Sequence, residues 1–316
     1  MVVISNKSST LVKLDLYDKK LIYLLSQDMR LPLREAARRL RISPERVRYK
    51  VNRLLTEVLS PAINLDFVML GFQSAVILVE RLEQAAADAL LHDGNLAMYF
   101  RILSRNEYLL IVVTENLESF CQTHLANAQI TVYPVTNFIP DDYNAFHLNL
   151  TPIPLPKRTD YVPERRDYVL LSALAQNPIA PYQDLATVTG FDRNSIRGHI
   201  ERLKSAGVIL KFRYGINIFK IGMLIYFIRL QLTPESRRKL IPLLRTDPYA
   251  GFIYETYDGL FMFYMPPDQH PLFDFTSRIA ERDPGARVEI LQAADYFKVE
   301  PMPGNIIPVL RKRAGL

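Results

Sequence analysis

The sequence predicts an α+β protein in which two winged helix-turn-helix domains alternate with two ferredoxin-like βαββαβ domains. Three observations predict this class. The chain of 316 residues is long enough for several modules, its apolar residues change twice from helical spacing to strand-like alternation, and its second half repeats the pattern of its first. We expect domains over 1–65, 66–139, 164–218 and 219–295, with a proline-rich linker at 140–163 and a C-terminal tail at 296–316.

Composition narrows the class of protein. Hydrophobic residues make up 49% and charged residues 23% of the chain, values typical of a globular protein. No stretch of eighteen apolar residues lacks a charge or a breaker, which argues against a transmembrane helix, and the N-terminus lacks the apolar run of a signal peptide. Cys121 is the single cysteine, which excludes intrachain disulfides and cysteine zinc clusters. We expect a cytoplasmic protein that uses no membrane, metal or cofactor.

The two halves match each other without a gap at an offset of 149 residues over the first helical module. The matched pairs include Asp18 with Asp167, Leu21 with Leu170, Pro32 with Pro181, Ala37 with Ala186, Arg48 with Arg197 and Arg53 with Arg202. After an adjustment of two residues the match continues, with Gly71 on Gly222 and Leu109 on Leu260. Internal repetition on this scale predicts a divergent tandem duplication.

Each repeat begins with three short helices. In the first repeat, apolar spacing predicts a helix over 15–27, and Ser43 with Pro44 forms an N-cap followed by proline at the first helical position. The third helix then runs to about Glu57, and 58–68 is expected to form a short β-wing. A tight turn before a capped third helix is the helix-turn-helix pattern. The corresponding helices of the second half start near Glu164, Pro181 and Arg193.

Each repeat continues with alternating apolar residues. In the first half, strands are expected at 75–81, 96–103, 109–114 and 130–135, with helices at 84–91 and 117–126. This order is the ferredoxin-like arrangement, and the second half repeats it over 223–291. Phe261 and Phe263 share one strand face, and Met262 and Tyr264 share the other. An apolar second face needs a partner, which predicts a homodimer formed through these domains.

Two proline-rich segments flank the second repeat. The linker at 140–163 contains five prolines and favours extended chain, so we expect a semi-rigid connector. The tail from Lys298 to Leu316 also contains prolines and ends in basic residues. Its pattern fits a disordered tail and a docking segment equally well.

Several short motifs recur in the same order in both helical modules. In the first half they are Leu14-Asp15 with Asp18, Glu35-Ala36-Ala37, Ser43 with Val47-Arg48, and Arg53-Leu54. In the second half they are Asp167, Asp184-Leu185-Ala186, Gly190, Ile196-Arg197, Arg202-Leu203 and Ala206-Gly207-Val208-Ile209. In this order they resemble the head of the leucine-responsive regulator family (Lrp/AsnC). The resemblance implies transcriptional regulation through sequence-specific binding of duplex DNA, with sheet domains that dimerise and often sense amino acids.

The small-molecule loop is a departure from this family. The loop usually reads Thr-Gly-x-Tyr-Asp, whereas 103–107 and 254–258 of this chain both lack the glycine. This difference argues against an amino-acid effector and leaves the existence of a small-molecule effector open. The family also usually has one head per chain, so here one chain imitates a family dimer.

In a helix-turn-helix the third helix enters the major groove, while cations nearby contact the DNA backbone. Arginine can bond guanine in bidentate fashion. In the first head, the residues expected to contact duplex DNA are Arg34, Arg38, Ser43, Arg46, Arg48, Tyr49, Lys50, Asn52 and Arg53. In the second head they are Arg193, Asn194, Ser195, Arg197 and His199.

Positive charge is concentrated in the first head. The window from Arg30 to Arg53 holds nine basic and two acidic residues, a net charge of +7, and because the whole chain carries +6 the rest of it carries −1. From Pro181 to Lys204 four basic residues face three acidic ones, a net charge of +1. Since phosphate attraction scales with the charges neutralised, we expect the first head to supply most of the affinity.

Two other functions stay open. Sirohaem decarboxylases resemble the same two-domain fold and work as paired subunits, with a histidine and a tyrosine of the sheet around the tetrapyrrole. The corresponding strands here, 96–103 and 250–257, contain no histidine. No catalytic motif appears either, so we expect the chain not to be an enzyme and assign no catalytic residue. The third reading is a chromatin or protein-interaction module that contacts protein through its winged helices.

Overall fold

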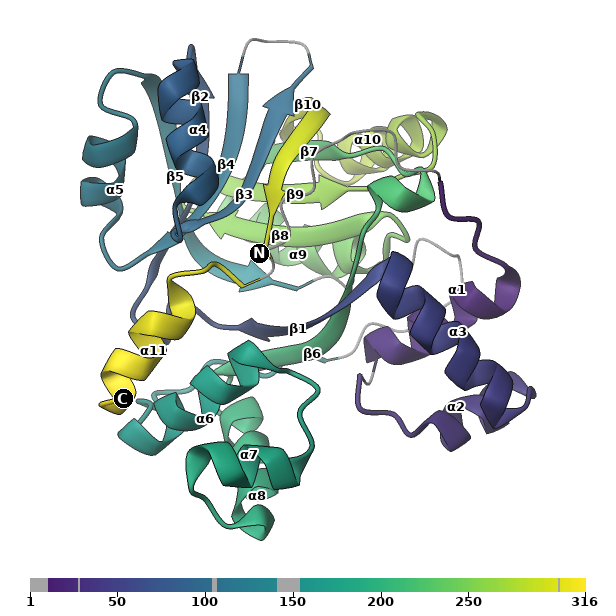
Figure 1. Cartoon of the computed structure of the whole chain (residues 1–316). Helices are drawn as coiled ribbons and strands as arrows, with labels where there is room; N and C mark the ends of the chain where they lie inside the picture. Colours follow the sequence, from purple (N-terminus) through teal and green to yellow (C-terminus); the bar gives the residue numbers. More distant parts are fainter. Residues whose placement is uncertain (1–10, 28, 104–106, 141–153, 301) are drawn as a thin grey trace.

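The computed structural model describes residues 11–27, 29–103, 107–140, 154–300 and 302–316. Most of the predicted linker (141–153) and the middle of the first small-molecule loop (104–106) lie outside the described residues. Figure 1 shows two helical heads, below and to the right of a body that combines strands and helices.

Each head is a group of three helices, as predicted. Head 1 consists of α1 (Leu16–Gln27), α2 (Leu33–Leu40) and α3 (Pro44–Glu57), and head 2 of α6 (Arg165–Gln176), α7 (Tyr182–Thr189) and α8 (Arg193–Ser205). Side-chain caps begin both third helices. The Ser43 hydroxyl accepts a hydrogen bond from the Arg46 amide, and the Asp192 carboxylate accepts from the amides of Asn194 and Ser195.

Each half of the body has the element order βαββαβ. In the first half the elements are β2 (Gln73–Glu80), α4 (Gln84–His92), β3 (Leu96–Ile102), β4 (Glu107–Thr114), α5 (Leu117–His124) and β5 (Gln129–Ile139). In the second half they are β7 (Tyr226–Gln231), α9 (Pro234–Thr246), β8 (Ala250–Thr256), β9 (Gly259–Tyr264), α10 (His270–Arg282) and β10 (Arg287–Val299). In each half the two helices pack on one face of the sheet, where Leu90 and Phe120 anchor the first pair and Leu240 and Phe275 the second.

The two sheets are joined at both edges, so the prediction of two separate ferredoxin-like domains is wrong. Strand β5 pairs first with β2 and then, from Val135 onward, with β8 of the other half. Strand β10 pairs first with β7 and then, from Ala293 onward, with β3. The result is a closed eight-stranded barrel in the order β10-β3-β4-β2-β5-β8-β9-β7. Closure of the barrel is favourable because neither sheet is left with an edge of unpaired backbone groups.

The barrel interior is filled by apolar side chains from both halves. Phe100 of β3 meets Phe227 of β7 with ring centroids 4.8 Å apart, and Phe227 meets Phe263 of β9 at 4.7 Å. Phe261 and Phe263 belong to this interior, whereas Met262 packs on the helix-covered side. The apolar second face of each sheet is therefore covered within the chain and does not require a second copy. The homodimer stays a prediction.

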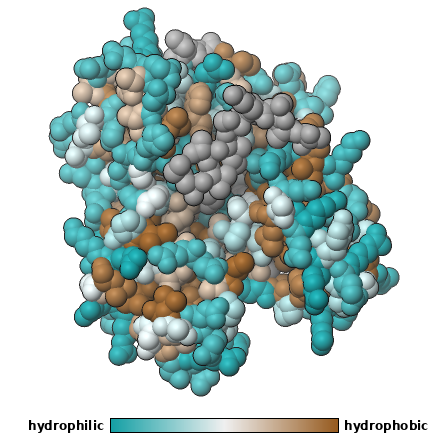
Figure 2. All heavy atoms as spheres, viewed as in Figure 1, coloured by the Kyte–Doolittle hydropathy of each residue, from teal (hydrophilic) through white to brown (hydrophobic). Residues whose placement is uncertain are grey.

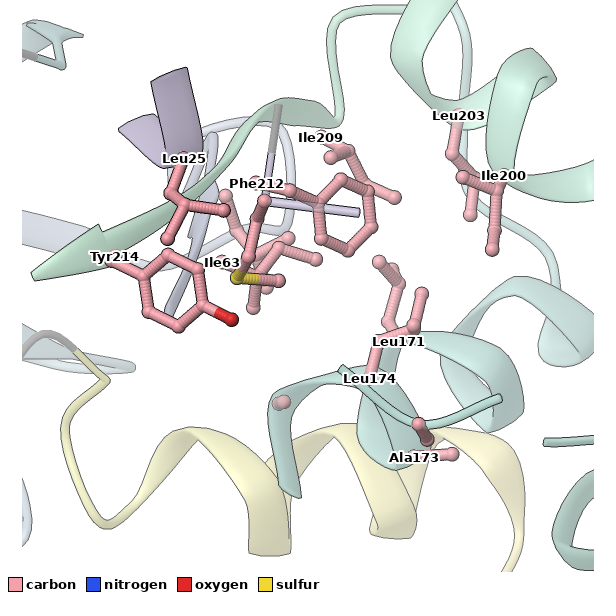
Figure 3. Close-up of a cluster of buried hydrophobic side chains, with 14 of the residues drawn as sticks. Leu25, Ile63, Leu171, Ala173, Leu174, Ile200, Leu203, Ile209, Phe212 and Tyr214 are labelled. Carbon is pink, nitrogen blue, oxygen red and sulfur yellow. The ribbon is translucent and has the colours of Figure 1, made fainter. Parts of the chain in front are cut away.

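A two-stranded ribbon joins the heads to the barrel. It consists of β1 (Leu59–Leu65) and β6 (Ile209–Ile216), which pair antiparallel across the two halves. The predicted wing at 58–68 is thus a strand whose partner comes from the other half. Ile63, Phe212 and Tyr214 pack on one face of the ribbon into a core that both heads share (Figure 3).

The C-terminal tail docks rather than hanging free. Its helix α11 (Ile306–Ala314) packs on α6 of head 2, and the Arg165 side chain donates a 2.7 Å hydrogen bond to the Ala314 carbonyl. Arg313 pairs with Glu115 at 2.9 Å and lies over the ring of Phe72 at 4.9 Å. The tail therefore ties head 2 to the first half of the barrel.

Barrel closure gives a test at Gly259, the first residue of β9. A Cβ at this position would overlap the carbonyl oxygen of Leu230 in the neighbouring strand β7. Gly259→Ala is expected to lower the free energy of unfolding by about 3 kcal/mol through this clash. Gly198→Ala on α8 is the control, because a Cβ there meets nothing within 4 Å. The control is expected to raise that free energy by about 1 kcal/mol, the helix-propensity difference. Chemical denaturation measures both, and equal effects would contradict the prediction.

Candidate functional site

A large cavity lies between the ribbon and the barrel, and we call it the ribbon–barrel cavity. Its volume of about 760 Å³ falls within the range of about 300–1,000 Å³ found for small-molecule sites. Apolar side chains from the barrel make up much of its wall. They are Met98, Phe100, Ile225, Phe252, Phe263 and Met265.

The ribbon presents different chemistry on its two faces because strand side chains alternate. Ile63 and Phe212 pair across the ribbon and pack into the core of the heads. Ala62 and Arg213, the next pair, line the cavity on the barrel side. Arg213 is buried, and its guanidinium lies 4.5 Å from the centre of the Phe252 ring. A buried cation above an aromatic wall favours a ligand that is both flat and anionic.

Other ionisable groups of the cavity lie on β10 and at its rim. Lys298 is buried and donates a 2.8 Å hydrogen bond to the carbonyl of Asp93, and its ammonium lies 3.5 Å from Glu300. His92 is exposed at the end of α4 and contributes to the lining. With Arg213 and Lys220, the described lining thus has three basic side chains against the two acidic side chains of Glu57 and Glu300.

One tyrosine, Tyr296 of β10, lines the cavity. Its ring stacks on Phe219 of the short 3-10 helix η1 (Phe219–Ile221), with centroids 3.7 Å apart and planes 17° apart. Burial raises the pKa of Tyr296 and outweighs the hydrogen bond to the Asn217 side chain, which acts in the opposite direction. The hydroxyl therefore keeps its proton at neutral pH.

The residues predicted to contact DNA on head 1 divide into two groups. Arg34, Arg38, Ser43, Arg46, Arg48, Tyr49 and Asn52 are exposed. Figure 2 shows a mostly hydrophilic surface over this head, at the right of the view. Lys50 is instead buried and Arg53 is half-buried. The exposed group is the part of the prediction that can meet a partner.

Lys50 and Arg53 are engaged inside the head. The Lys50 ammonium donates to Asp15 at 2.6 Å and to the buried Asp18 at 2.9 Å, and Arg53 donates to Asp18 at 2.6 Å. Burial acts to lower the pKa of Lys50, but these hydrogen bonds outweigh it and raise the pKa. The hydrogen bond from Lys50 lowers the pKa of Asp15 to about 2. Both carboxylates lie before the window from Arg30 to Arg53, so its net charge of +7 does not include them. This value therefore overstates the positive charge available to a partner.

Other cations of head 1 are also partly neutralised. Arg38 and Arg39 both bond Glu35 at 2.7 Å, and these hydrogen bonds lower the pKa of Glu35 to about 2. Arg30 reaches across to head 2, where it donates to the carbonyls of Pro178 and Ala180 at 3.0 and 3.2 Å. The exposed arginines that form no ion pair within the described part of head 1 are Arg34, Arg41, Arg46 and Arg48.

On head 2, Arg193, Asn194, Ser195 and Arg197 are exposed on α8, as predicted for a contact face. His199 is half-buried with its ring 5.4 Å from that of Phe191, and burial lowers its pKa, so it is neutral at pH 7. Head 2 repeats the internal ion pair of head 1. Arg202 donates to the buried Asp167 at 2.8 Å.

Two negative findings concern the described residues. They contain no group of three or more histidine, cysteine or acidic side chains arranged to hold a metal ion. Among the helices built from them, none combines the length and the apolar character needed to cross a membrane.

Comparison with known proteins gives a local and a whole-chain likeness. Residues 164–209, which form head 2 and the start of β6, match the family described as winged helix-turn-helix DNA-binding. The crystal structure of the sirohaem decarboxylase NirDL covers 95% of this chain and 98% of its own, at 10% identity and a TM-score of 0.60. LrpC of B. subtilis covers 40% of this chain and 96% of its own, at 24% identity and a TM-score of 0.36. No curated protein sequence matches the chain.

These comparisons correct one expectation. The chain contains a winged helix-turn-helix domain, and its whole fold is similar to that of a solved enzyme. This whole-chain likeness contradicts the expectation that the chain is not an enzyme, which is therefore wrong. That expectation rests on the absence of familiar catalytic motifs. Sequence motifs report local spacing, whereas the ribbon–barrel cavity is assembled from both halves of the chain.

The ion cluster of head 1 gives a second test. Asp18→Asn leaves the charge of the buried Lys50 without its buried partner and is expected to lower the free energy of unfolding by about 3–5 kcal/mol. Asp15→Asn is the matched control. Asp15 bonds the same ammonium but its side chain is half exposed, so a loss of about 1 kcal/mol or less is expected. Thermal and chemical denaturation measure the difference, and equal losses would contradict the assignment of Asp18 as the internal anchor.

Proposed function

We propose that the chain binds a large, flat tetrapyrrole with carboxylate side chains in the ribbon–barrel cavity and removes carboxyl groups from it. The observation that carries the proposal is the cavity itself, about 760 Å³ with apolar walls and buried cations, in a chain that shares its whole fold with a sirohaem decarboxylase. A second structure of that enzyme is a complex with an iron-uroporphyrin III analogue and covers 95% of this chain at a TM-score of 0.58. The aromatic walls suit a macrocycle, and Arg213 suits its carboxylates.

The proposed reaction needs little beyond binding and a proton. Loss of CO₂ from an acetate side chain breaks a carbon–carbon bond and leaves the electron pair on the methylene carbon. That carbon then takes up a proton and becomes a methyl group. Tyr296 lines the cavity with a protonated hydroxyl and is the side chain we assign as the proton source. The strands expected to hold a histidine hold none, and the histidine that the described lining includes is the exposed His92.

Titration with iron-uroporphyrin III tests this proposal. Binding is expected to shift the absorbance of the tetrapyrrole, and mass spectrometry is expected to detect products that have lost CO₂. Arg213→Met is expected to weaken binding about tenfold, because a charge-assisted hydrogen bond to a carboxylate is lost. Arg282→Met is the control, since Arg282 is exposed at the end of α10, outside the cavity lining. A wild-type chain that leaves the absorbance unchanged would rule the proposal out.

Duplex DNA is the second candidate ligand. Head 2 lies within the match to a DNA-binding family, and head 1 carries exposed arginines at the positions where a helix-turn-helix meets DNA. We propose that head 1 provides most of the affinity and that the chain acts as a sequence-specific regulator, with a homodimer and a small-molecule effector as further parts of this proposal. A chromatin or protein-interaction role is the outcome if binding lacks sequence preference or needs no DNA.

We also propose that the two halves of the chain arose by duplication of one ancestral unit. The two heads share an ion pair between a buried aspartate on the first helix and an arginine on the third, Asp18 with Arg53 and Asp167 with Arg202. The matched glycines Gly71 and Gly222 also share a positive φ, at 73° and 77°. The ion pair recurs at the offset of 149 residues and the glycine at the adjusted offset of 151.

Matched charge reversals test the DNA proposal. Arg48 and Arg197 occupy corresponding, exposed positions on α3 and α8. Arg48→Glu is expected to weaken binding of genomic duplex fragments about tenfold or more, and Arg197→Glu only a few-fold, because head 1 carries more of the phosphate contacts. Electrophoretic mobility-shift titration at fixed salt measures both. Equal losses would contradict the dominance of head 1.

A further inference from the structure

The turn between α2 and α3 holds an arginine in a backbone conformation that side chains rarely adopt. Arg41 follows α2 with φ 54° and ψ 45°, in the left-handed region, and its amide bonds to the carbonyls of Ala37 and Arg38. In head 2 the corresponding position is Gly190, with φ 70° and ψ 14° and an amide bond to Ala186. Glycine is the residue that ordinarily ends a helix in this way, because it has no Cβ to strain the turn.

The fold gives no reason for an arginine at this position. The side chain of Arg41 is exposed and makes no hydrogen bond or ion pair among the described residues. A Cβ added at Gly190 meets nothing within 4 Å, so the matching turn has space for a side chain without requiring one. Head 1 therefore keeps a strained residue whose side chain contributes no contact to the head. Strained residues of this kind concentrate at functional positions.

The surroundings of Arg41 indicate what the side chain is for. Five of the nine basic residues between Arg30 and Arg53 are engaged by carboxylates or by carbonyls of the protein. Arg41 is one of the exposed basic residues of this window that are not engaged in this way. It lies two residues before the Ser43 cap that begins α3. When α3 enters the major groove, the turn before it lies beside the DNA backbone.

We propose that Arg41 contacts a backbone phosphate of duplex DNA and is retained in head 1 for its charge despite the strain of the turn. This inference rests on the proposed binding of DNA by head 1. It adds a residue to the contact surface that the charge pattern alone did not single out. Because Gly190 occupies the same turn in head 2, the inference also assigns a physical origin to the weaker phosphate attraction expected there.

Substitution of Arg41 separates a role in binding from a role in folding. Arg41→Gly removes both the charge and the strain, so the melting temperature is expected to rise by about 2 °C. Affinity for a mixed-sequence DNA duplex is expected to fall several-fold, and the slope of log Kobs against log salt to become shallower by about 0.9, the value for one phosphate contact. Arg41→Lys keeps the charge and is expected to restore most of the affinity and of the slope. Arg41→Asn tolerates the turn without the charge and is expected to bind like the glycine variant.

The outcomes are distinct. If the wild-type chain binds the duplex and Arg41→Gly binds it with the same affinity and salt slope, the role of Arg41 is overturned while the DNA proposal stands. A lower melting temperature for Arg41→Gly would show that the side chain supports the head, which also overturns the inference. If the wild-type chain binds no duplex at all, the DNA proposal and the role of Arg41 fall together.

Discussion

The pairing of β5 with β8 and of β10 with β3 is the constraint on which the rest of the structure depends. Each half of the chain would otherwise expose a sheet with two unpaired edges and one uncovered apolar face. The long last strand of each half removes both problems, because its second part extends onto the edge of the other sheet. Closure also fixes the two halves relative to each other. The ribbon of β1 and β6, which precedes β2 and β7, is thereby held against the barrel.

The ribbon makes the heads and the cavity parts of one unit. Ile63 and Phe212 on one face complete the core of the heads, while Ala62 and Arg213 on the other face line the cavity. The last turn of α3 contributes Leu55 to the same lining. A ligand in the cavity would therefore contact the end of the helix that carries the exposed arginines of head 1. A single layer of two strands separates the proposed DNA-binding part from the ribbon–barrel cavity.

The sequence predicts what is local and misses what is paired over long distances. The cap at Ser43 and the helical spacing place the helices of head 1 within a residue or two, because these signals act within one turn. Strand alternation shows which side chains share a face but not which strand is the neighbour, so barrel closure was missed. The sequence alone predicts that Lys50 contacts DNA, because its partners Asp15 and Asp18 lie 35 and 32 residues away and local patterns do not show them. The match between the two halves contains a signal for this internal pairing, because Asp18 and Arg53 recur together as Asp167 and Arg202.

The difference in positive charge between the two heads does not lie on their third helices. Exposed arginines that form no ion pair among the described residues are balanced on the third helices, with Arg46 and Arg48 on α3 against Arg193 and Arg197 on α8. The excess of head 1 lies on α2 and in the turn after it, whereas α7 has no basic residue. The second helix and this turn lie beside the backbone of bound DNA rather than its base edges. If the heads bind DNA as proposed, they differ mainly in the phosphate contacts available to them, and their third helices offer comparable arginines to the bases.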